Sequence, residues 1–288
     1  MFTTYNITLI ITIFLISNNG WSLENPWSKI TTPATGDAKI IGSYSAGCIQ
    51  GAVSILSDTG TFEIMRQSRR RYFAHPQLRQ FIIWFAKSIY NQGYGKLLVG
   101  DLGQARGGPT TTGHASHQIG LDADFWFWLE SNKLTSYDKE HLSAPSMLNS
   151  SQTKVNFARL GDAQIQVLKM AATHPQVERI FVHPLIKQAV CKRTNSATWL
   201  RKIRPWFGHH YHFHVRLACP SDQPKCKAQE PVPETDGCGE ELDSWLHPKA
   251  QENADKESTA ERKLTPEQRL AIKLNRVPAE CATILHSD

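Results

Sequence analysis

One stretch decides the fold and the chemistry of this chain: Gly113-His114-Ala115-Ser116-His117-Gln118-Ile119-Gly120-Leu121-Asp122-Ala123-Asp124. It is complemented by a second, distant stretch, His212-Phe213-His214. Imidazole nitrogens and carboxylate oxygens are ligands that zinc takes in tetrahedral sites, and a catalytic zinc keeps one position open for water. The two stretches together therefore supply a candidate zinc site that uses no cysteine.

The aspartates of the first stretch lie at the start of a predicted strand. Residues 121–128 are rich in aromatic side chains and follow a glycine, which is typical of a short strand that begins after a turn. Side chains along a strand alternate between its two faces. Asp122 and Asp124 are therefore expected on one face, and Trp126 and Trp128 further along it, where they flank a cleft.

The histidines of the second stretch lie on another predicted strand, residues 211–217. His212 and His214 share one of its faces. If the two strands are neighbours, Asp124 and His214 converge on one ion. The loop before the first strand is flexible enough to bring His117 to the same point, because it is rich in glycine. Its glycines are Gly107, Gly108, Gly113 and Gly120.

A simpler structural explanation competes with the metal site. The chain has 12 histidines among 288 residues, so close pairs arise by chance. Most such histidines are surface or core residues with ordinary hydrogen bonds, and either pair alone favours that interpretation. The two pairs together, with carboxylates on a strand, favour a metal site.

Further blocks of sequence carry a resemblance to a known family. The chain resembles the penicillin-insensitive murein endopeptidases, zinc peptidases of the wider group that includes lysostaphin-type enzymes, D-Ala-D-Ala metallopeptidases and the hedgehog signalling domain. The resemblance runs from about Pro26 to Trp245 and rests on several blocks in order. These blocks are Gly47–Ile49, Arg70–Pro76, Gly113–Asp124, Arg179–Val182, Trp199–Phe207, His212–Arg216 and Asp236–Gly239.

The resemblance implies a set of zinc ligands. The family's ligands fall on His117, Asp124 and His214. His114 matches the first histidine of the family's His-x-x-His, which holds a metal in some of these enzymes, so it is a second or alternative ligand. Family members can add an Asp and a His after the strand of Asp124 as part of a second metal site, but residues 149–154 contain neither. A second metal ion is therefore not expected.

The resemblance also implies a reaction. His212 matches a residue near the metal that is not a ligand, and His209 matches a further active-site histidine. The implied enzyme is a zinc D,D-endopeptidase that hydrolyses the D-alanyl–diaminopimelate cross-link of peptidoglycan. In such a site zinc lowers the pKa of a bound water and stabilises the oxyanion. His212 would act as general base or stabilise the developing charge, and His209 would assist or protonate the leaving amine.

Two other functions stay open at this point. One is a zinc D,D- or L,D-carboxypeptidase that uses the same chemistry on wall peptides but releases a terminal residue. The other is a non-catalytic zinc module that binds the wall or a partner, as in the hedgehog case. The presence of both His209 and His212 argues against the non-catalytic module.

The first residues have the features of an export signal. Residues 7–16 form an apolar run that is too short to span a bilayer as a helix but suits the core of a signal peptide. Gly20 and Ser22 have the spacing that a signal peptidase favours, which predicts cleavage after Ser22. Residues 1–22 are thus expected to be a signal peptide, and the mature protein is expected in the periplasm without a membrane span. No Lys or Arg precedes the apolar run, and the alternative is an uncleaved anchor.

Six cysteines in an exported chain predict disulfides. Composition alone allows about fifteen pairings. The resemblance implies the pairs Cys48–Cys281, Cys191–Cys238 and Cys219–Cys226, the last closing a tight loop after the His-x-His strand. Free buried thiols are the alternative, and a cysteine zinc site is not expected because the chain contains no Cys-x-x-Cys.

Helical and strand patterns are mixed without strict alternation, which favours an α+β fold. We expect a small antiparallel sheet that carries the zinc ligands, is flanked by helices and is cross-linked by disulfides. The peptidase domain is expected over residues 23–247. Residues 248–288 are expected to be a charged linker and a tail tied back by a disulfide, since residues 248–263 have almost no large apolar side chain. Helices are expected over residues 76–92, 162–172, 184–191, 197–203 and 265–275, and further strands over 96–102 and 178–182.

Arginine-rich runs at residues 66–71 and 201–204 raise the question of nucleic-acid binding. The net charge is only +6, and no nucleic-acid-binding motif is present. No nucleic-acid partner is therefore expected. These arginines are expected to bind internal carboxylates or the carboxylates of the cell-wall peptide. Nothing in the sequence specifies an oligomeric state.

Overall fold

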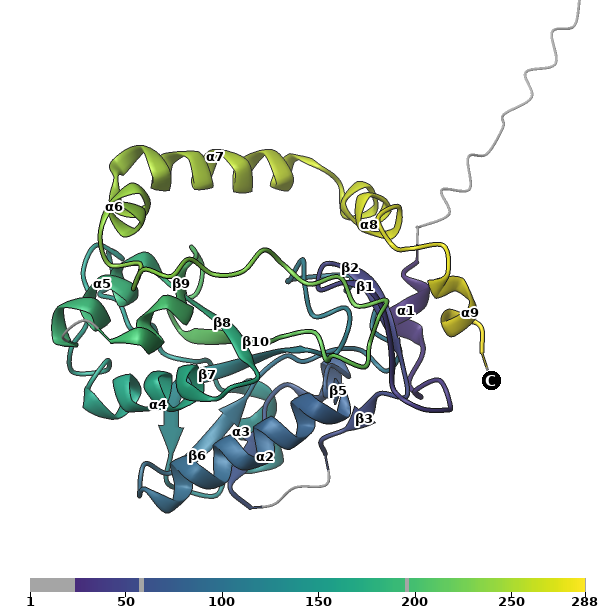
Figure 1. Cartoon of the computed structure of the whole chain (residues 1–288), viewed down its shortest axis with the longest axis horizontal. Coiled ribbons are helices and arrows are strands. Elements are labelled where there is room, and N and C mark those ends of the chain that lie inside the picture. The colour runs from purple at the N-terminus through teal and green to yellow at the C-terminus, as the bar shows by residue number, and fades with distance from the viewer. Residues whose placement is uncertain (1–23, 57–59, 195–196, 288) are drawn as a thin grey trace, which may run out of the picture.

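The computed structural model describes residues 24–56, 60–194 and 197–287 (Figure 1). The expected signal peptide, residues 1–22, lies outside the described residues. The strands are β1 (Lys39–Ser43), β2 (Ala46–Gln50), β3 (Val53–Ser54), β4 (Phe62–Ile64), β5 (Phe73–Ala74), β6 (Lys96–Val99), β7 (Asp122–Glu130), β8 (Val177–Val182), β9 (Ile203–Pro205) and β10 (His212–Leu217). The helices are α1 (Pro26–Lys29), α2 (Pro76–Asn91), α3 (Ser136–His141), α4 (Asp162–Thr173), α5 (Pro184–Arg193), α6 (Glu240–Leu246), α7 (Pro248–Lys263), α8 (Pro266–Leu274) and α9 (Cys281–Leu285), with 3₁₀ helices η1 (Gln67–Arg69) and η2 (Thr198–Lys202).

The centre of the fold is a six-stranded sheet with the strand order β4-β6-β7-β10-β8-β9. Its inner strands run antiparallel to one another, whereas the edge strands β4 and β9 pair in parallel with β6 and β8. Two-stranded sheets β1-β2 and β3-β5 accompany it. The α+β prediction is confirmed, and the expected antiparallel sheet is the inner part of a larger mixed sheet.

Strands β7 and β10 are direct neighbours, which meets the condition under which Asp124 and His214 were expected to converge. Their register places His214 opposite Asp124 and Arg216 opposite Asp122. All four side chains belong to alternate positions of their strands, so they lie on one face of the sheet. The predicted convergence of Asp124 and His214 thus follows directly from strand pairing.

Helix α2 covers the opposite face of the sheet. It begins at Pro76, and the side chain of His75 caps it by accepting the backbone N–H of Gln77. Phe85 of α2 packs on Phe125 of β7, with ring centroids 5.4 Å apart. Each large apolar side chain buried in this way stabilises the fold by about 1.5–3 kcal/mol. This packing directs the apolar face of β7 inward and leaves the polar face for the site. The buried residues of α2 are Leu78, Phe81, Ile82, Phe85, Ala86 and Ile89.

The segment expected to be a linker is instead helix α7, which runs between α6 and α8 along one edge of the molecule (Figure 1). Its described side chains are exposed, except that Ala250 and Ala254 are half-buried. Alanine, glutamate, lysine and glutamine are strong helix formers, so a helix forms here without an apolar face. Low hydrophobicity predicted the exposure correctly but does not distinguish a solvated helix from a linker.

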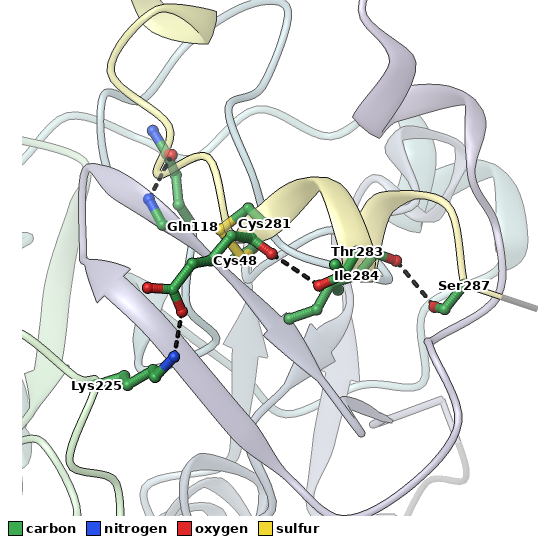
Figure 2. Close-up of a disulfide and its surroundings, with 9 residues drawn as sticks. Cys48, Gln118, Lys225, Cys281, Thr283, Ile284 and Ser287 are labelled. Carbon is green, nitrogen blue, oxygen red and sulfur yellow. Dashed lines mark hydrogen bonds and ion pairs between the residues drawn. A yellow bond between two sulfur atoms is a disulfide. The ribbon is translucent and has the colours of Figure 1, made fainter.

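The end of the chain returns to the domain, as expected. Thr265 caps helix α8, because its side chain accepts the backbone N–H of Gln268. At the start of α9, Cys281 is bonded to Cys48 of β2 (Figure 2). The guanidinium of Arg106 donates to the carbonyl oxygen of Ile284 at 3.0 Å. The tail is therefore held by one covalent link and by polar contacts to the domain.

The other disulfides cross-link the remaining parts of the fold. Cys191–Cys238 joins α5 to the loop before α6, and Cys219–Cys226 closes the loop after β10. The three pairs are those that the resemblance implies. Among the described residues no cysteine is free, and no helix combines the length and apolar composition needed to cross a bilayer.

Smaller predictions differ from the structure at element ends. The segment 197–203 forms the 3₁₀ helix η2 and one strand residue rather than an α-helix. Helix α4 begins at Asp162 and its N-cap is Gly161. The side chain of Gln164 reaches back to the Gly161 N–H at 3.0 Å, which satisfies a backbone donor at the helix start.

Candidate metal centre

The centre is built around the carboxylate of Asp124 on β7. Strand pairing sets His214 beside it, with His214 Nδ1 3.1 Å from Asp124 Oδ1. The Asp124 side chain is almost fully buried. Burial raises the pKa of Asp124, but the charges of His114, His117 and His212 outweigh this effect and hold the pKa well below its usual value. The carboxylate is therefore a permanent negative charge surrounded by imidazoles.

The loop before β7 brings His117 to the same carboxylate. His117 Nε2 lies 3.4 Å from Asp124 Oδ1. The backbone of His117 has a φ of 68°, which non-glycine residues rarely adopt, and its N–H donates to Asp122 Oδ2 at 3.0 Å. The glycines of this loop fix its path rather than loosen it. At Gly107, with a φ of 69°, a Cβ atom would lie 1.9 Å from the carbonyl oxygen of Gln118.

Several atoms of the centre have unmet bonding capacity. Asp124 Oδ1 and both ring nitrogens of His117 are buried and make no hydrogen bond within the described part of the chain. Buried polar atoms in proteins nearly always have a hydrogen-bond partner. A cation would satisfy a carboxylate oxygen and an imidazole nitrogen that face each other in this way. Nitrogen and carboxylate oxygen are also the donor set that zinc prefers in catalytic sites.

His114 lies on the other oxygen of the carboxylate. Its Nε2 is 3.1 Å from Asp124 Oδ2 and 3.3 Å from Asp101 Oδ2. His114, His117 and Asp124 each offer one ligand atom, and these atoms lie within 4.8 Å of one another. The structure thus groups the expected alternative ligand with two of the three expected ligands, while His214 contacts the group through Asp124. All the histidines singled out in the sequence, His114, His117, His209, His212 and His214, meet in this region.

The segment expected to lack a second metal site has a structural role of its own. Asn149 Oδ1 accepts the backbone N–H groups of Thr153 and Lys154 at 2.9 and 3.1 Å. The Asn149 side chain therefore closes a turn and is already satisfied. Among the described residues, the cluster of His114, His117 and Asp124 is the one group of this kind.

Asp122 supports the centre from behind, a role that sequence analysis missed. It is fully buried and accepts hydrogen bonds from His214 Nε2 at 2.9 Å and from Arg216 Nε at 2.7 Å. His214 therefore carries its proton on Nε2 and presents Nδ1 to the centre, an arrangement typical of metal-binding histidines. Burial raises the pKa of Asp122, but the charges of Arg216 and His214 outweigh it and hold the pKa far below its usual value. The signal was present in the sequence, because Arg216 continues the alternation of His212 and His214.

Asp101 is a second supporting carboxylate that sequence analysis missed. It directly follows Gly100 at the end of β6 and accepts hydrogen bonds from Arg71 Nη1 at 2.8 Å and from Arg69 Nη1 at 3.2 Å. Burial raises its pKa, but the hydrogen bond from His114 and the charge of Arg71 outweigh this effect and lower the pKa to about 2. No sequence motif marks Asp101, since its importance arises only from the pairing of β6 with β7.

His212 and His209 lie next to the centre, but farther from the Asp124 carboxylate than the other histidines of the centre. His212 Nε2 lies 3.7 Å from Asp124 Oδ1, and both its ring nitrogens are buried without a hydrogen bond in the described chain. The ring of His209 lies 4.9 Å from that of His212, between centroids. His209 Nδ1 is 3.1 Å from the carbonyl oxygen of Phe207, which only accepts, so Nδ1 carries the proton. Burial lowers the pKa of His212 to about 4 and that of His209 to about 3.

The centre lies in an open cleft made of adjoining hollows of about 320 and 470 Å³. Both hollows are lined by Arg69, Asp101, His114, Tyr211 and His212. Trp126 lines the first hollow, as expected, and Trp128 lines a neighbouring one. Buried ligand atoms at the wall of a solvent-open cleft meet the geometric requirement for a hydrolytic site.

Known proteins share this chain's sequence from β1 to α9. The sequence model of the family described as penicillin-insensitive murein endopeptidase matches residues 40–286. The chain belongs to this family. A penicillin-insensitive murein endopeptidase of Klebsiella pneumoniae subsp. pneumoniae is 43% identical over 245 residues, which cover 84% of this chain and 88% of that protein. One from Escherichia coli O1:K1 / APEC is 41% identical over 244 residues, which cover 84% and 89%.

Membership of the penicillin-insensitive murein endopeptidases confirms the resemblance drawn from the sequence blocks. This membership makes the chain a peptidase. The cluster of His114, His117 and Asp124 is consistent with a metal-dependent peptidase. The match ends at residue 286 and so includes α7, α8 and α9. The C-terminal tail is therefore part of the family's common sequence.

Proposed function

We propose that this chain is a periplasmic zinc endopeptidase that hydrolyses the D-alanyl–meso-diaminopimelate cross-link of peptidoglycan. The observation that carries the proposal is the pair of buried atoms Asp124 Oδ1 and His117 Nε2, which lie 3.4 Å apart and make no hydrogen bond to any described residue, with Asp124 at the wall of the cleft. Membership of a family of murein endopeptidases supports the substrate class. Three disulfides support an oxidising compartment such as the periplasm.

His117, Asp124 and His214 would hold the zinc, with His114 as an alternative ligand. When bound, zinc polarises water and the scissile carbonyl and stabilises the negative charge that develops on oxygen. Asp122 orients His214 by accepting its Nε2–H, and thereby directs Nδ1 toward Asp124. The same carboxylate accepts the His117 backbone N–H, so one buried group positions two ligands.

His212 and His209 would move the protons. Amide hydrolysis requires that water lose a proton and that the leaving amine gain one. His212 lines both hollows and has no hydrogen-bond partner for either ring nitrogen within the described chain, so it is available as a base. His209 lines the second hollow and carries its proton on Nδ1, so its Nε2 is able to accept a proton. We assign the general-base role to His212, which would take the proton from water and return it to the leaving amine, and the assisting role to His209.

Digestion of a purified cross-linked muropeptide dimer tests the proposal. The purified mature protein is incubated with the dimer alone, with a chelator, and with chelator followed by excess zinc. The expected products are two monomers, formed only when zinc is available. Release of one terminal amino acid from uncross-linked peptides, with the dimer left intact, would instead identify a carboxypeptidase. Tight binding of the dimer without any product would identify a non-catalytic wall-binding module.

A further inference from the structure

Three arginine side chains line the hollows of the cleft: Arg66, Arg69 and Arg71. Arg66 donates to the carbonyl oxygens of Glu140 and Leu142 and thus binds the C-terminal end of α3. The question is which of the other two is free to meet a substrate.

Arg71 is also committed to the protein. Its Nη1 donates to Asp101 Oδ2 at 2.8 Å, and its Nη2 donates to the carbonyl oxygen of Thr112 at 2.8 Å. Its side chain is only 10% exposed. The positive charge of Arg71 balances the charge of the buried Asp101 carboxylate without Arg69.

Arg69 differs from both. Only its Nη1 donates to a protein acceptor, Asp101, at 3.2 and 3.3 Å to the two oxygens. Nε and Nη2 make no hydrogen bond to any described residue, and the side chain is 48% exposed. Arg69 lines both hollows of the cleft. It therefore presents an anchored guanidinium with unused donors to the space beside the metal centre.

A series of side-chain contacts links Arg69 to the metal centre. Asp101 Oδ2 lies 3.2 Å from Arg69 Nη1 and 3.3 Å from His114 Nε2, and His114 Nε2 lies 3.1 Å from Asp124 Oδ2. Thus one carboxylate and one imidazole separate the guanidinium from Asp124. The backbone also holds Arg69 in place, because the Arg69 N–H donates to the carbonyl oxygen of Arg66 in a turn at 3.0 Å.

The proposed substrate has an anionic group close to the bond that is cleaved. Diaminopimelate carries two amino and two carboxyl groups. At its cross-linked end the amino nitrogen is part of the scissile amide, and the carbon that bears this nitrogen also bears a free carboxylate. That carboxylate is two bonds from the reacting nitrogen. Guanidinium groups bind carboxylates strongly through paired N–H donors.

We infer that Arg69 binds the free carboxylate beside the scissile amide and is a specificity-determining residue of this enzyme. The inference rests on the proposed function. Arg69 selects an acceptor residue that carries a negative charge at this position and disfavours one in which the charge is absent. Since the contact exists before and during the reaction, its loss raises KM more than it lowers kcat.

A cycle of enzyme and substrate changes tests the inference. Two dimers are compared, one with the free carboxylate at the cross-linked diaminopimelate and one in which this carboxylate is amidated. The enzymes are the wild type, Arg69→Gln, Arg69→Lys and the control Arg70→Gln. Arg70 is the adjacent exposed arginine, and it lines neither hollow. Zinc content and melting temperature are measured for each variant.

For the wild type and Arg70→Gln, amidation should lower kcat/KM by about 10–100-fold, the usual effect of losing a hydrogen bond to a charged group. On the dimer with the free carboxylate, the kcat/KM of Arg69→Gln should be lower than that of the wild type by about the same factor. Its kcat/KM values for the two dimers should differ by less than about 3-fold. Arg69→Lys should retain part of the discrimination, since it keeps the charge without the paired donors.

Two results overturn the inference. One is a wild-type enzyme with the same kcat/KM on the amidated and the free-carboxylate dimer, and the other is an Arg69→Gln enzyme that discriminates between the dimers as strongly as the wild type. The wild-type comparison needs no variant, so it decides the matter even if Arg69→Gln does not fold. The proposed function is judged separately, because it predicts cleavage of the free-carboxylate dimer by the wild type whatever Arg69 does.

Discussion

Substitution of Asp122 by Asn probes the buried support of the metal centre. The change keeps the shape of the side chain and removes its charge. In the wild type, Asp122 Oδ1 accepts from His214 Nε2 and Arg216 Nε, and Oδ2 accepts from the His117 N–H and Arg216 Nη2. An amide nitrogen in place of either oxygen would point a donor at two donors. The variant therefore cannot satisfy all its neighbours in any rotamer.

The magnitude follows from the burial of Arg216, whose side chain is only 6% exposed. Leaving a buried charge without its partner costs about 3–5 kcal/mol, against a total stability of about 5–15 kcal/mol. In a domain of this size such a loss lowers Tm by about 10 °C. Loss of the group that orients His214 should also weaken zinc binding by about 10–100-fold.

Thermal unfolding and competition with a chromophoric zinc chelator measure the two effects. The matched control is Asp37→Asn, since Asp37 is an exposed carboxylate on the surface. We expect the control to behave as the wild type. If Asp122→Asn retained wild-type Tm and wild-type zinc affinity, the assignment of Asp122 as the support of His214 and His117 would be wrong.

Three further predictions test other parts of the account. His212→Ala should keep its zinc and lose about 10²–10⁴-fold in turnover, the usual range for a general acid or base; parallel loss of zinc, measured by metal analysis, would make His212 a ligand. Burial lowers the pKa of Lys187 from 10.5 to about 7 in the folded protein. Between pH 7 and pH 10.5 the unfolded chain therefore binds a proton at Lys187 that the folded protein does not, so the free energy of unfolding rises with pH. In urea titrations from pH 7 to 10, Lys187→Met should therefore show a flatter rise than the wild type, and an unchanged slope would contradict the shift. Cys226→Ser opens the loop after β10 and should lower activity more than secretion, as judged by assay and immunoblot; a fully active reduced protein would refute this.

The positions of Asp124 and His214 in the site were predicted mainly from the alternation of side chains along strands. Period-two spacing placed Asp124 and His214 on matching faces, and pairing of β7 with β10 then brought them together. Helical periodicity likewise predicted the helix over residues 76–92, which is α2. Such local patterns hold because burial of one face decides which way every side chain on a strand or helix points.

Other features depend on contacts between distant segments, which no local pattern encodes. Asp101 joins the centre only because β6 pairs with β7, and the parallel edge strands of the sheet gave no separate signal. The left-handed backbone of His117 depends on its hydrogen bond to Asp122. Helix α7 was predicted as a linker because its solvated composition hides its helix propensity.

The central claim is that one zinc at His117, Asp124 and His214 performs the hydrolysis. The most direct measurement is the metal content of the purified mature protein, taken together with dimer cleavage before and after metal removal. We expect close to one zinc per molecule, activity that disappears and returns with the zinc, and loss of both zinc and activity in His117→Ala and His214→Ala. A metal-free protein that remained fully active would show that zinc does not perform the hydrolysis, and two zinc ions per molecule would rule out a single-metal site.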